Sequence, residues 1–449
     1  MRQSANTVLP VNPGTNPMHH FSRRSRSQST IYSGDARSAK PIYHFIEREK
    51  KLSLTINVSK SGGDFSCIQE AINAVPYEED ATIHISEGIY KEKIFSEKRD
   101  ITLIGDGIDK TILSFDDYAN EIMEDGSKRG TFRSYTAFFG GGKVHVKDMT
   151  IRNSAGDGRA VGQAIAVYAD ANLCFFENVK MTGCQDTLFC APLPRQERKK
   201  NGFLGPRVMT ERRLTSQYYK NCTITGDVDF IFGGADAVFD DCTIICNDRM
   251  HVSLTEAGSC SAAPQSQSSS SAISVTTQAT TSSSTTSITT SAASSNSTAY
   301  TASTTPAGAS SLDKDQIDTR ERFINGYITA ACGRSQDLGF VFRNCRIGGA
   351  KGCEEGSVFL GRPWRDEAKT VFLNCTMDKT IAPERFSGWG GINLDQPETF
   401  YGEFGTGLVD SSIIFADLSR KNSWVKDISE SDAATISSRA DEVVQMVLA

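Results

Sequence analysis

Two short stretches of the sequence place aspartates among apolar residues, and both raise the same chemical question. The stretch GDVDFIFGGADAVF at 226–239 carries Asp227 and Asp229, and GCQDTLF at 183–189 carries Asp186. Burying a carboxylate among apolar side chains is unfavourable unless a partner or a proton neutralises it. Aspartates in such places are therefore candidates for chemistry.

Both stretches follow a repeated sequence motif at the same distance. The motif reads as an apolar residue, any residue, Asn or Asp, an apolar residue or Cys, any residue, and Ile or Met. It occurs as VKDMTI at 146, FENVKM at 176, YKNCTI at 219, FDDCTI at 239, FRNCRI at 342 and FLNCTM at 372. Asp186 lies ten residues after Phe176, and Asp229 lies ten residues after Tyr219. If the repeats stack in register, the two carboxylates occupy equivalent positions on strands about 4.8 Å apart.

A pair of neighbouring carboxyl groups can supply two chemical roles. Like charges hinder each other's ionisation, so the pKa values of such a pair separate. One group then stays anionic as a nucleophile or base, and the other holds a proton as an acid. The alternative is a pair of aspartates that cap turns on a solvated face. The apolar flanks favour a walled cleft instead, and these are Leu188, Phe189, Phe230, Ile231 and Phe232. Asp227 has no counterpart in GCQDTLF, so we expect it to be a turn residue.

The spacing of the repeats predicts the architecture that must position these aspartates. Neighbouring copies start 30, 43, 20, 103 and 30 residues apart. A coil of a parallel β-helix takes roughly 20 or more residues, and insertions lie in its turns, so an all-β stacked solenoid is favoured. A β-sandwich would need regular hairpin turns, and few Asn-Gly or Asp-Gly pairs separate these strands.

Stacking also accounts for the cysteines of the repeats without any chemistry. Cys222, Cys242, Cys345 and Cys375 occupy the same position of the motif. No CxxC pair occurs in the chain, so we expect small buried apolar side chains rather than zinc ligands.

Composition divides the chain into regions. Residues 1–53 are expected to be a disordered leader, and residues 54–425 are expected to form a single β-helix domain. Residues 257–312 contain no charged residue and consist mainly of Ser, Thr and Ala, which predicts a disordered loop within that domain.

Helical patterns are expected only near the two ends of the domain. A short N-terminal capping helix is predicted by apolar residues that share one helical face and end at Pro76. These residues are Phe65, Ile68, Ile72 and Val75. Residues 426–449 are expected to form a helical C-terminal tail.

The bulk composition excludes several function classes. A formal net charge of −6 argues against nucleic acid as the main partner. No apolar run reaches the roughly 18 residues of a membrane span, and residues 1–30 lack the apolar core of a secretory signal. The six histidines lie outside the repeats, and GxSxG, HExxH and GxxxxGK motifs do not occur. We therefore expect neither a Ser–His–Asp hydrolase nor a bound metal or cofactor.

Six motifs in order resemble the signatures of pectin methylesterases, which are built on a right-handed parallel β-helix. They are GIYKEKI at 88–94, ITLIGDG at 101–107, GQAIAVY at 162–168, GCQDTLF, GDVDFIFG and LGRPW at 360–364. The resemblance runs from about Leu54 to Trp424. It implies hydrolysis of galacturonate methyl esters to methanol and free carboxylates, with pectin as the partner, a monomeric state and an extracellular or cell-wall location.

The resemblance also implies a role for each matching residue. Asp229 matches the nucleophile, and Asp186 matches the acid that protonates methanol and later the base that activates water. Gln163 and Gln185 match the amides that stabilise the oxyanion, and Arg362 matches the cation paired with the nucleophile. Substrate contacts are implied for Thr131 and Trp364, together with Gln163 and Arg362. For Trp364 a packed rim aromatic is the alternative.

Two departures from the family pattern affect what the chain would recognise. Ala331 stands where the family commonly has glutamine, and this change is expected to alter a substrate subsite. The loop at 192–213 is long and basic, and it either contacts galacturonate carboxylates or is simply solvated. Its cations are Arg195, Arg198, Lys199, Lys200 and Arg207. Two other functions stay open: a same-fold esterase or thioesterase for a different ester, and a non-catalytic polysaccharide-binding β-helix.

Overall fold

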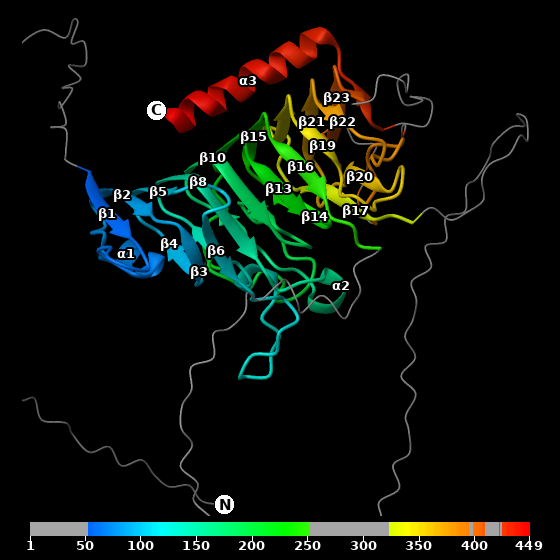
Figure 1. Ribbon diagram of the computed structural model, residues 1–449. Coiled ribbons are helices and arrows are strands. Elements are labelled where there is room, and N and C mark those ends of the chain that lie inside the picture. The colour runs from blue at the N-terminus through cyan, green and yellow to red at the C-terminus, as the bar shows by residue number, and fades with distance from the viewer. Residues whose placement is uncertain are drawn as a thin grey trace, which may run out of the picture. The chain divides into compact units, whose positions relative to one another are not determined.

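The computed structural model describes residues 53–250, 323–390, 392, 394, 398–408, 422 and 424–449. The loop expected at 257–312 lies outside these residues, and so does the expected leader except for Ser53. The described strands form three ladders of parallel strands that wind as one solenoid (Figure 1).

The first ladder runs the length of the solenoid. Its strands are β1 (Leu54–Val58), β2 (Asp80–Ile85), β5 (Asp100–Gly105), β8 (Lys143–Asn153), β10 (Leu173–Thr182), β12 (Ser216–Lys220), β15 (Asp236–Asp240), β18 (Phe340–Arg343), β21 (Lys369–Leu373), β23 (Phe400–Phe404) and β25 (Lys426–Asp427).

The second ladder shares β8 and β10 with the first, because these two strands are long enough to contribute to both. Its other strands are β3 (Gly88–Lys91), β6 (Thr111–Phe115), β13 (Thr223–Gly226), β16 (Thr243–Cys246), β19 (Arg346–Gly349), β22 (Thr376–Met377) and β24 (Gly407–Leu408).

The third ladder is a separate sheet. Its strands are β4 (Ile94–Ser96), β7 (Ala137–Phe139), β9 (Val167–Ala169), β11 (Leu188–Cys190), β14 (Val228–Gly233), β17 (Gly326–Ala331) and β20 (Val358–Gly361). All strand pairings in the three ladders are parallel, which confirms the predicted β-helix and makes the β-sandwich alternative wrong.

The sequence repeats stack in register, as their spacing predicts. Phe176 pairs with Tyr219, and Tyr219 pairs with Phe239. Neighbouring aromatic rings from Phe176 to Phe372 lie 5.1, 4.5, 4.4 and 4.6 Å apart. Because these distances match the spacing of adjacent strands, each ring lies over the next.

The Asn or Asp of each repeat turns the chain from the first ladder to the second. These residues have φ between 51° and 55°, and they are Asp148, Asn178, Asn221, Asp241, Asn344 and Asn374. Few L residues tolerate this left-handed conformation, and Asn and Asp are among those that do. The cysteines that follow are buried and free of disulfides, as expected.

Helices cover the N-terminal end and one side of the solenoid. α1 (Ile68–Ala74) ends before Pro76 and buries Ile68 and Ile72, which confirms the predicted capping helix. α3 (Glu430–Leu448) begins after Ser429, whose side chain accepts a hydrogen bond from the Asp432 N–H. It crosses β10, β12 and β15 (Figure 1). The C-terminal helix is therefore confirmed as well.

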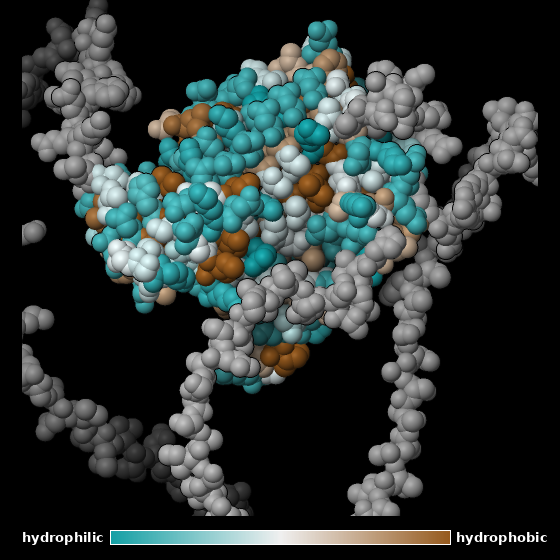
Figure 2. Space-filling model, viewed as in Figure 1, coloured by the Kyte–Doolittle hydropathy of each residue, from teal (hydrophilic) through white to brown (hydrophobic). Residues whose placement is uncertain are grey.

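Three apolar cores hold these elements together. The largest fills the solenoid, and a second lies between α3 and the first ladder, where Val447 packs near Val238. The third covers the outer face of the third ladder and includes Phe189, Phe232 and, from the 192–213 loop, Phe203. On the face seen in Figure 2, the surface is mostly hydrophilic, with small separate hydrophobic patches.

These cores correct the expected walls of an apolar cleft. Leu188, Phe230 and Ile231 pack inside the solenoid, while Phe189 and Phe232 are buried on its outer face. None of the five is more than 3% exposed. The prediction of a cleft walled by these residues was wrong, because all five side chains are packed in the inner and outer cores of the third ladder.

Candidate active site

The third ladder brings the two predicted carboxylates together. The pairing of β11 with β14 aligns Leu188 with Ile231. Asp186 and Asp229 each lie two residues before those positions, and the Asp186 N–H donates to the Val228 carbonyl over 3.1 Å. The aspartates therefore occupy equivalent positions on adjacent coils, as the repeat spacing predicts.

Both aspartates have a backbone conformation that is rare outside glycine. Their φ angles are 65° at Asp186 and 52° at Asp229. At Asp229 the strand also carries a bulge, because Val228 pairs with Tyr327 whereas Ile231 pairs with Thr329. A bulge reorients the side chain that it carries and is common beside active sites.

Arg362 supplies the charge partner that burial of Asp229 demands. Its Nε and Nη2 donate to the two carboxylate oxygens of Asp229 over 2.9 and 2.8 Å, and Asp229 is 6% exposed. The guanidinium carbon lies 3.9 Å from the ring centre of Tyr327 and 4.1 Å from that of Trp389. Two aromatic rings thus pack against the guanidinium, and its bidentate contact fixes the direction of the carboxylate.

The two carboxyl groups differ in how readily they ionise. Burial raises the pKa of Asp186 well above its usual range, and the nearby charge of Asp229 raises it further. Burial also raises the pKa of Asp229, but the Arg362 hydrogen bonds and charge counteract this effect. Asp229 is therefore the first of the pair to ionise, and Asp186 holds its proton to higher pH.

The two glutamines lie beside this pair. Gln163 precedes β9 and Gln185 precedes β11, and the Ala164 N–H donates to the Gln185 carbonyl over 3.0 Å. A Cβ atom at Gly158 would lie 2.9 Å from Cβ of Gln185, so this close approach requires glycine. Within the described residues neither side-chain amide has a protein hydrogen-bond partner. Both amides are therefore available to a ligand.

Thr131 and Trp364 lie on the segments that border these residues. Thr131 begins a 3₁₀-helix (Thr131–Arg133). Ala119 links this segment to Gln163, because its carbonyl accepts a hydrogen bond from the Gly130 N–H and its own N–H donates to the Gln163 carbonyl. Trp364 is half-buried, with its ring centre 5.8 Å from that of Phe232. Part of its surface stays exposed, and its contact with substrate stays a prediction.

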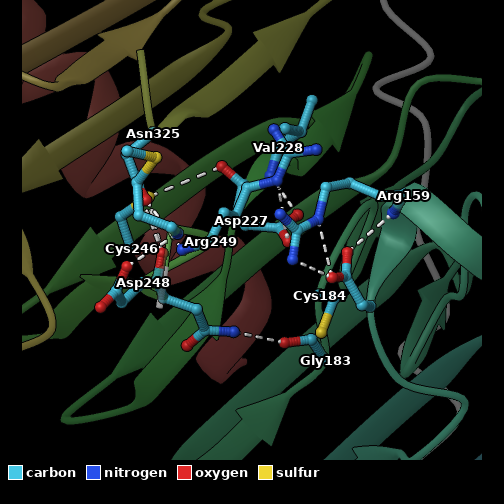
Figure 3. Close-up of polar contacts among 12 residues, drawn as sticks. Arg159, Gly183, Cys184, Asp227, Val228, Cys246, Asp248, Arg249 and Asn325 are labelled. Carbon is cyan, nitrogen blue, oxygen red and sulfur yellow. Dashed lines mark hydrogen bonds and ion pairs between the residues drawn. The ribbon is translucent and has the colours of Figure 1, made fainter. Parts of the chain in front are cut away.

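Asp227 occupies the bend between β13 and β14, where a turn residue was expected, but it is buried. Figure 3 shows its polar contacts. Its carboxylate accepts a hydrogen bond from the Val228 N–H over 2.6 Å and pairs with Arg249 at 3.5 Å. Burial raises the pKa of Asp227 to about 6, although Arg249 counteracts this effect. A second ion pair, between Asp157 and Arg159, lies close enough to influence it.

Sequence reasoning missed four residues around the carboxylates: Tyr327, Trp389, Arg249 and Arg159. Each comes from a segment outside the repeated motif. A usable signal existed only for Trp389, because the chain has just three tryptophans.

The two departures from the family pattern, Ala331 and the basic loop at 192–213, lie in different surroundings in the structure. Ala331 packs in the core of the solenoid, and its effect on a substrate subsite stays a prediction. In the basic loop, Arg207 is bound to Asp170 and Glu97. Arg195 and Arg198 line a cavity, whereas Lys199 and Lys200 are exposed outside it.

Neither a candidate membrane span nor a candidate metal site occurs among the described residues. They contain no helix with the length and apolar character needed to cross a membrane. Nor do they contain a group of three or more His, Cys, Asp or Glu side chains arranged to hold a metal ion.

Comparisons with known proteins find similarity to pectinesterases. A family model described as Pectinesterase matches residues 55–200, 211–301 and 311–424. The probable pectinesterase/pectinesterase inhibitor 64 of Arabidopsis thaliana is 28% identical over 380 residues, which cover 80% of this chain. The chain spans about half of that relative's length, since the same alignment covers 48% of the relative.

Solved structures of pectin methylesterases share the fold. The enzyme from carrot superposes with a TM-score of 0.57 at 22% identity, covering 86% of this chain and 92% of the carrot chain. A pectin methylesterase in complex with a hexasaccharide superposes with a TM-score of 0.55 at 19% identity, covering 85% of this chain and 95% of the other. At these identities the likeness shows the β-helix fold alone.

Proposed function

Because the chain belongs to the pectinesterase family, we propose that it hydrolyses the methyl esters of galacturonate units in pectin and releases methanol. The main support is the pair formed by Asp186 and Asp229, in which only Asp229 is held by a guanidinium. The related structure in complex with a hexasaccharide supports an oligosaccharide substrate.

In the first half of the proposed reaction, an oxygen of the Asp229 carboxylate attacks the ester carbonyl carbon, and an electron pair moves onto the carbonyl oxygen. The amides of Gln163 and Gln185 donate hydrogen bonds to this oxyanion, each contributing about 3 kcal/mol of transition-state stabilisation. When the intermediate collapses, the C–O bond to methoxide breaks and Asp186 gives its proton to the leaving methanol. Asp229 and the galacturonyl group are then joined as an anhydride.

In the second half, Asp186 is a carboxylate and takes a proton from water. The water oxygen attacks the galacturonyl carbonyl, and the bond to Asp229 breaks. The products are a free galacturonate carboxylate, a regenerated Asp229 carboxylate and a protonated Asp186. Asp186 thus serves first as acid and then as base, which suits a group with a raised pKa.

The direct test measures methanol release from methyl-esterified homogalacturonan by wild type, Asp229→Asn and Asp186→Asn, with and without a chelator. We expect wild type to release methanol in both conditions. Each variant should lose at least about a thousandfold in kcat, because each aspartate acts in bond making or breaking. Circular dichroism should show that the variants keep the fold.

Three outcomes would point elsewhere. Hydrolysis of small acyl esters without methanol release would favour a same-fold esterase for a different substrate. Pectin binding with no turnover in wild type would favour a non-catalytic β-helix. Loss of activity on chelation would indicate a metal-dependent reaction.

A further inference from the structure

The short helix α2 (Gly158–Val161) lies between the two glutamines that the proposed mechanism uses. Its first residue packs against Gln185, since a Cβ atom at Gly158 would lie 2.9 Å from Cβ of Gln185 and 3.2 Å from its Oε1. At the other end, Gly162 is the single residue that separates the helix from Gln163. The helix therefore contacts one glutamine at its start and leads directly into the other at its end.

Asp157 closes the first turn of this helix. Its carboxylate accepts hydrogen bonds from the Arg159 N–H over 2.8 Å and from the Arg159 Nε over 2.7 Å, and Asp157 is 6% exposed. The N–H groups of Ala160 and Val161 donate to the Asp157 carbonyl over 2.9 and 3.0 Å. Because a helix of four residues has few hydrogen bonds of its own, its conformation depends on this cap.

The cap stays ionised wherever the nucleophile is charged. Burial raises the pKa of Asp157, but the hydrogen bonds and charge of Arg159 outweigh this effect and hold the pKa below its usual value. The hydrogen bond with Asp157 likewise raises the pKa of Arg159. Since the pKa of Asp229 is raised, α2 keeps its ionic cap at every pH at which Asp229 is an anion.

Separate contacts hold the backbone that precedes Gln185. The Asp227 N–H donates to the Cys184 carbonyl over 3.0 Å, and the Asn247 side chain donates to the Gly183 carbonyl over 2.8 Å. Figure 3 shows the contact at Gly183 in the same cluster as Asp227. With the backbone fixed in this way, the Gln185 side chain depends on its contact with α2 for its position.

We propose that α2 positions the side-chain amides of Gln163 and Gln185 for the oxyanion. Asp157 and Gly158 are then positioning residues: Asp157 caps the helix, and Gly158 allows the helix to approach Gln185. This inference rests on the proposed function and adds residues that act through the glutamines. Preorganised donors stabilise an oxyanion only from the right positions, and a misplacement of about 1 Å can reduce a rate about a hundredfold.

The test adds one methyl group at each of two glycines. Gly158→Ala places it against Gln185 without backbone strain, because Gly158 is helical. Gly407→Ala is the matched control, since a Cβ atom at this exposed glycine of β24 would meet no heavy atom within 4 Å. Gly158→Ala should lower kcat for methanol release about ten- to a hundredfold with little change in KM, because the amides act mainly in the transition state. The control should match wild type.

A second pair of variants tests the cap. Asp157→Asn keeps a side-chain oxygen for the Arg159 N–H, and Asp157→Ala removes it. We expect Asp157→Ala to lose about tenfold in kcat and Asp157→Asn to retain most of the activity. This pair decides the question if Gly158→Ala does not fold. An unchanged kcat in Gly158→Ala, a rise in KM alone, or equal kcat in the two Asp157 variants would overturn the inference.

The two proposals can fail separately. Crystal structures of wild type and Gly158→Ala show whether the Gln185 amide moves relative to that of Gln163, and this comparison requires no turnover. If wild type releases no methanol, the proposed function fails, and an undisplaced Gln185 would still refute the role of α2. If wild type releases methanol and Gly158→Ala keeps its kcat, the proposed function stands and the positioning role is refuted.

Discussion

At the residue scale, two carboxylates with the same backbone conformation differ in their partners. Asp186 and Asp229 both have positive φ, but only Asp229 contacts a guanidinium. Burial alone would disfavour both anions. The bidentate contact with Arg362 selects Asp229 as the anion and leaves Asp186 as the proton holder, which is the division of roles that ester hydrolysis needs.

We expect methanol release to fall as pH drops through the pKa of Asp229. A protonated carboxyl is a poor nucleophile, and burial raises this pKa, so the decline should begin at higher pH than for an ordinary aspartate near about 3.9. The pH dependence of kcat/KM for methanol release measures it.

This loss of activity should not reflect unfolding caused by these carboxyls. Their folded-state pKa values are raised, so their contribution to stability is present at low pH and decreases as pH rises through the folded pKa. Thermal unfolding over the same pH range provides the control. A rate that does not change across the acidic range would contradict the assignment of Asp229.

Asp227 is expected to tune Asp186 without touching substrate. Its charge is one of the causes that raise the pKa of Asp186. Asp227→Asn keeps an oxygen for the Val228 N–H but removes the charge, so the basic limb of the kcat/KM profile should shift to lower pH. A reduced rate with an unmoved basic limb would indicate a purely structural role.

At the element scale, the repeats predicted the ladders because stacked coils need the same residue types at the same positions. The Asn or Asp position needs a left-handed turn, and the aromatic position needs a ring above and below. Arg362, Tyr327 and Trp389 converge from different coils, and nothing in their local sequence indicates their contact. The covering of the outer face by Phe203 was equally hidden, because the 192–213 loop has no periodicity.

The asparagine position offers a test of the ladder. Asn344 is exposed and has φ of 55°. Asn344→Gly should change stability little, because glycine adopts this conformation freely. Asn344→Val should destabilise the fold by about 1–3 kcal/mol through backbone strain. Urea unfolding of both variants checks this, and equal stability of the two would contradict the role assigned to the turn.

At the scale of the whole molecule, consecutive coils flank the long segment between β16 and β17. β14 pairs directly with β17, and β15 pairs with β18. The backbone N–H of Arg249 donates to the side chain of Asn325 over 2.8 Å, so the two ends of the segment lie side by side. The described coils on either side of the segment therefore pair directly with each other.

We therefore propose that residues 257–312 are an insertion within a single domain, and that deleting them leaves the domain intact. The remaining residues between Met250 and Phe323 are enough to join ends that already meet. Shortening a loop lowers its closure entropy by only about 0.6 kcal/mol for each halving of length, so Tm should be unchanged or slightly higher. Methanol release by the deletion variant should equal that of wild type. A deletion within the ladder, removing Phe340–Arg343, serves as the control that should abolish folding. If the 257–312 deletion unfolds the protein instead, the segment contributes to the domain and the single-insertion model is wrong.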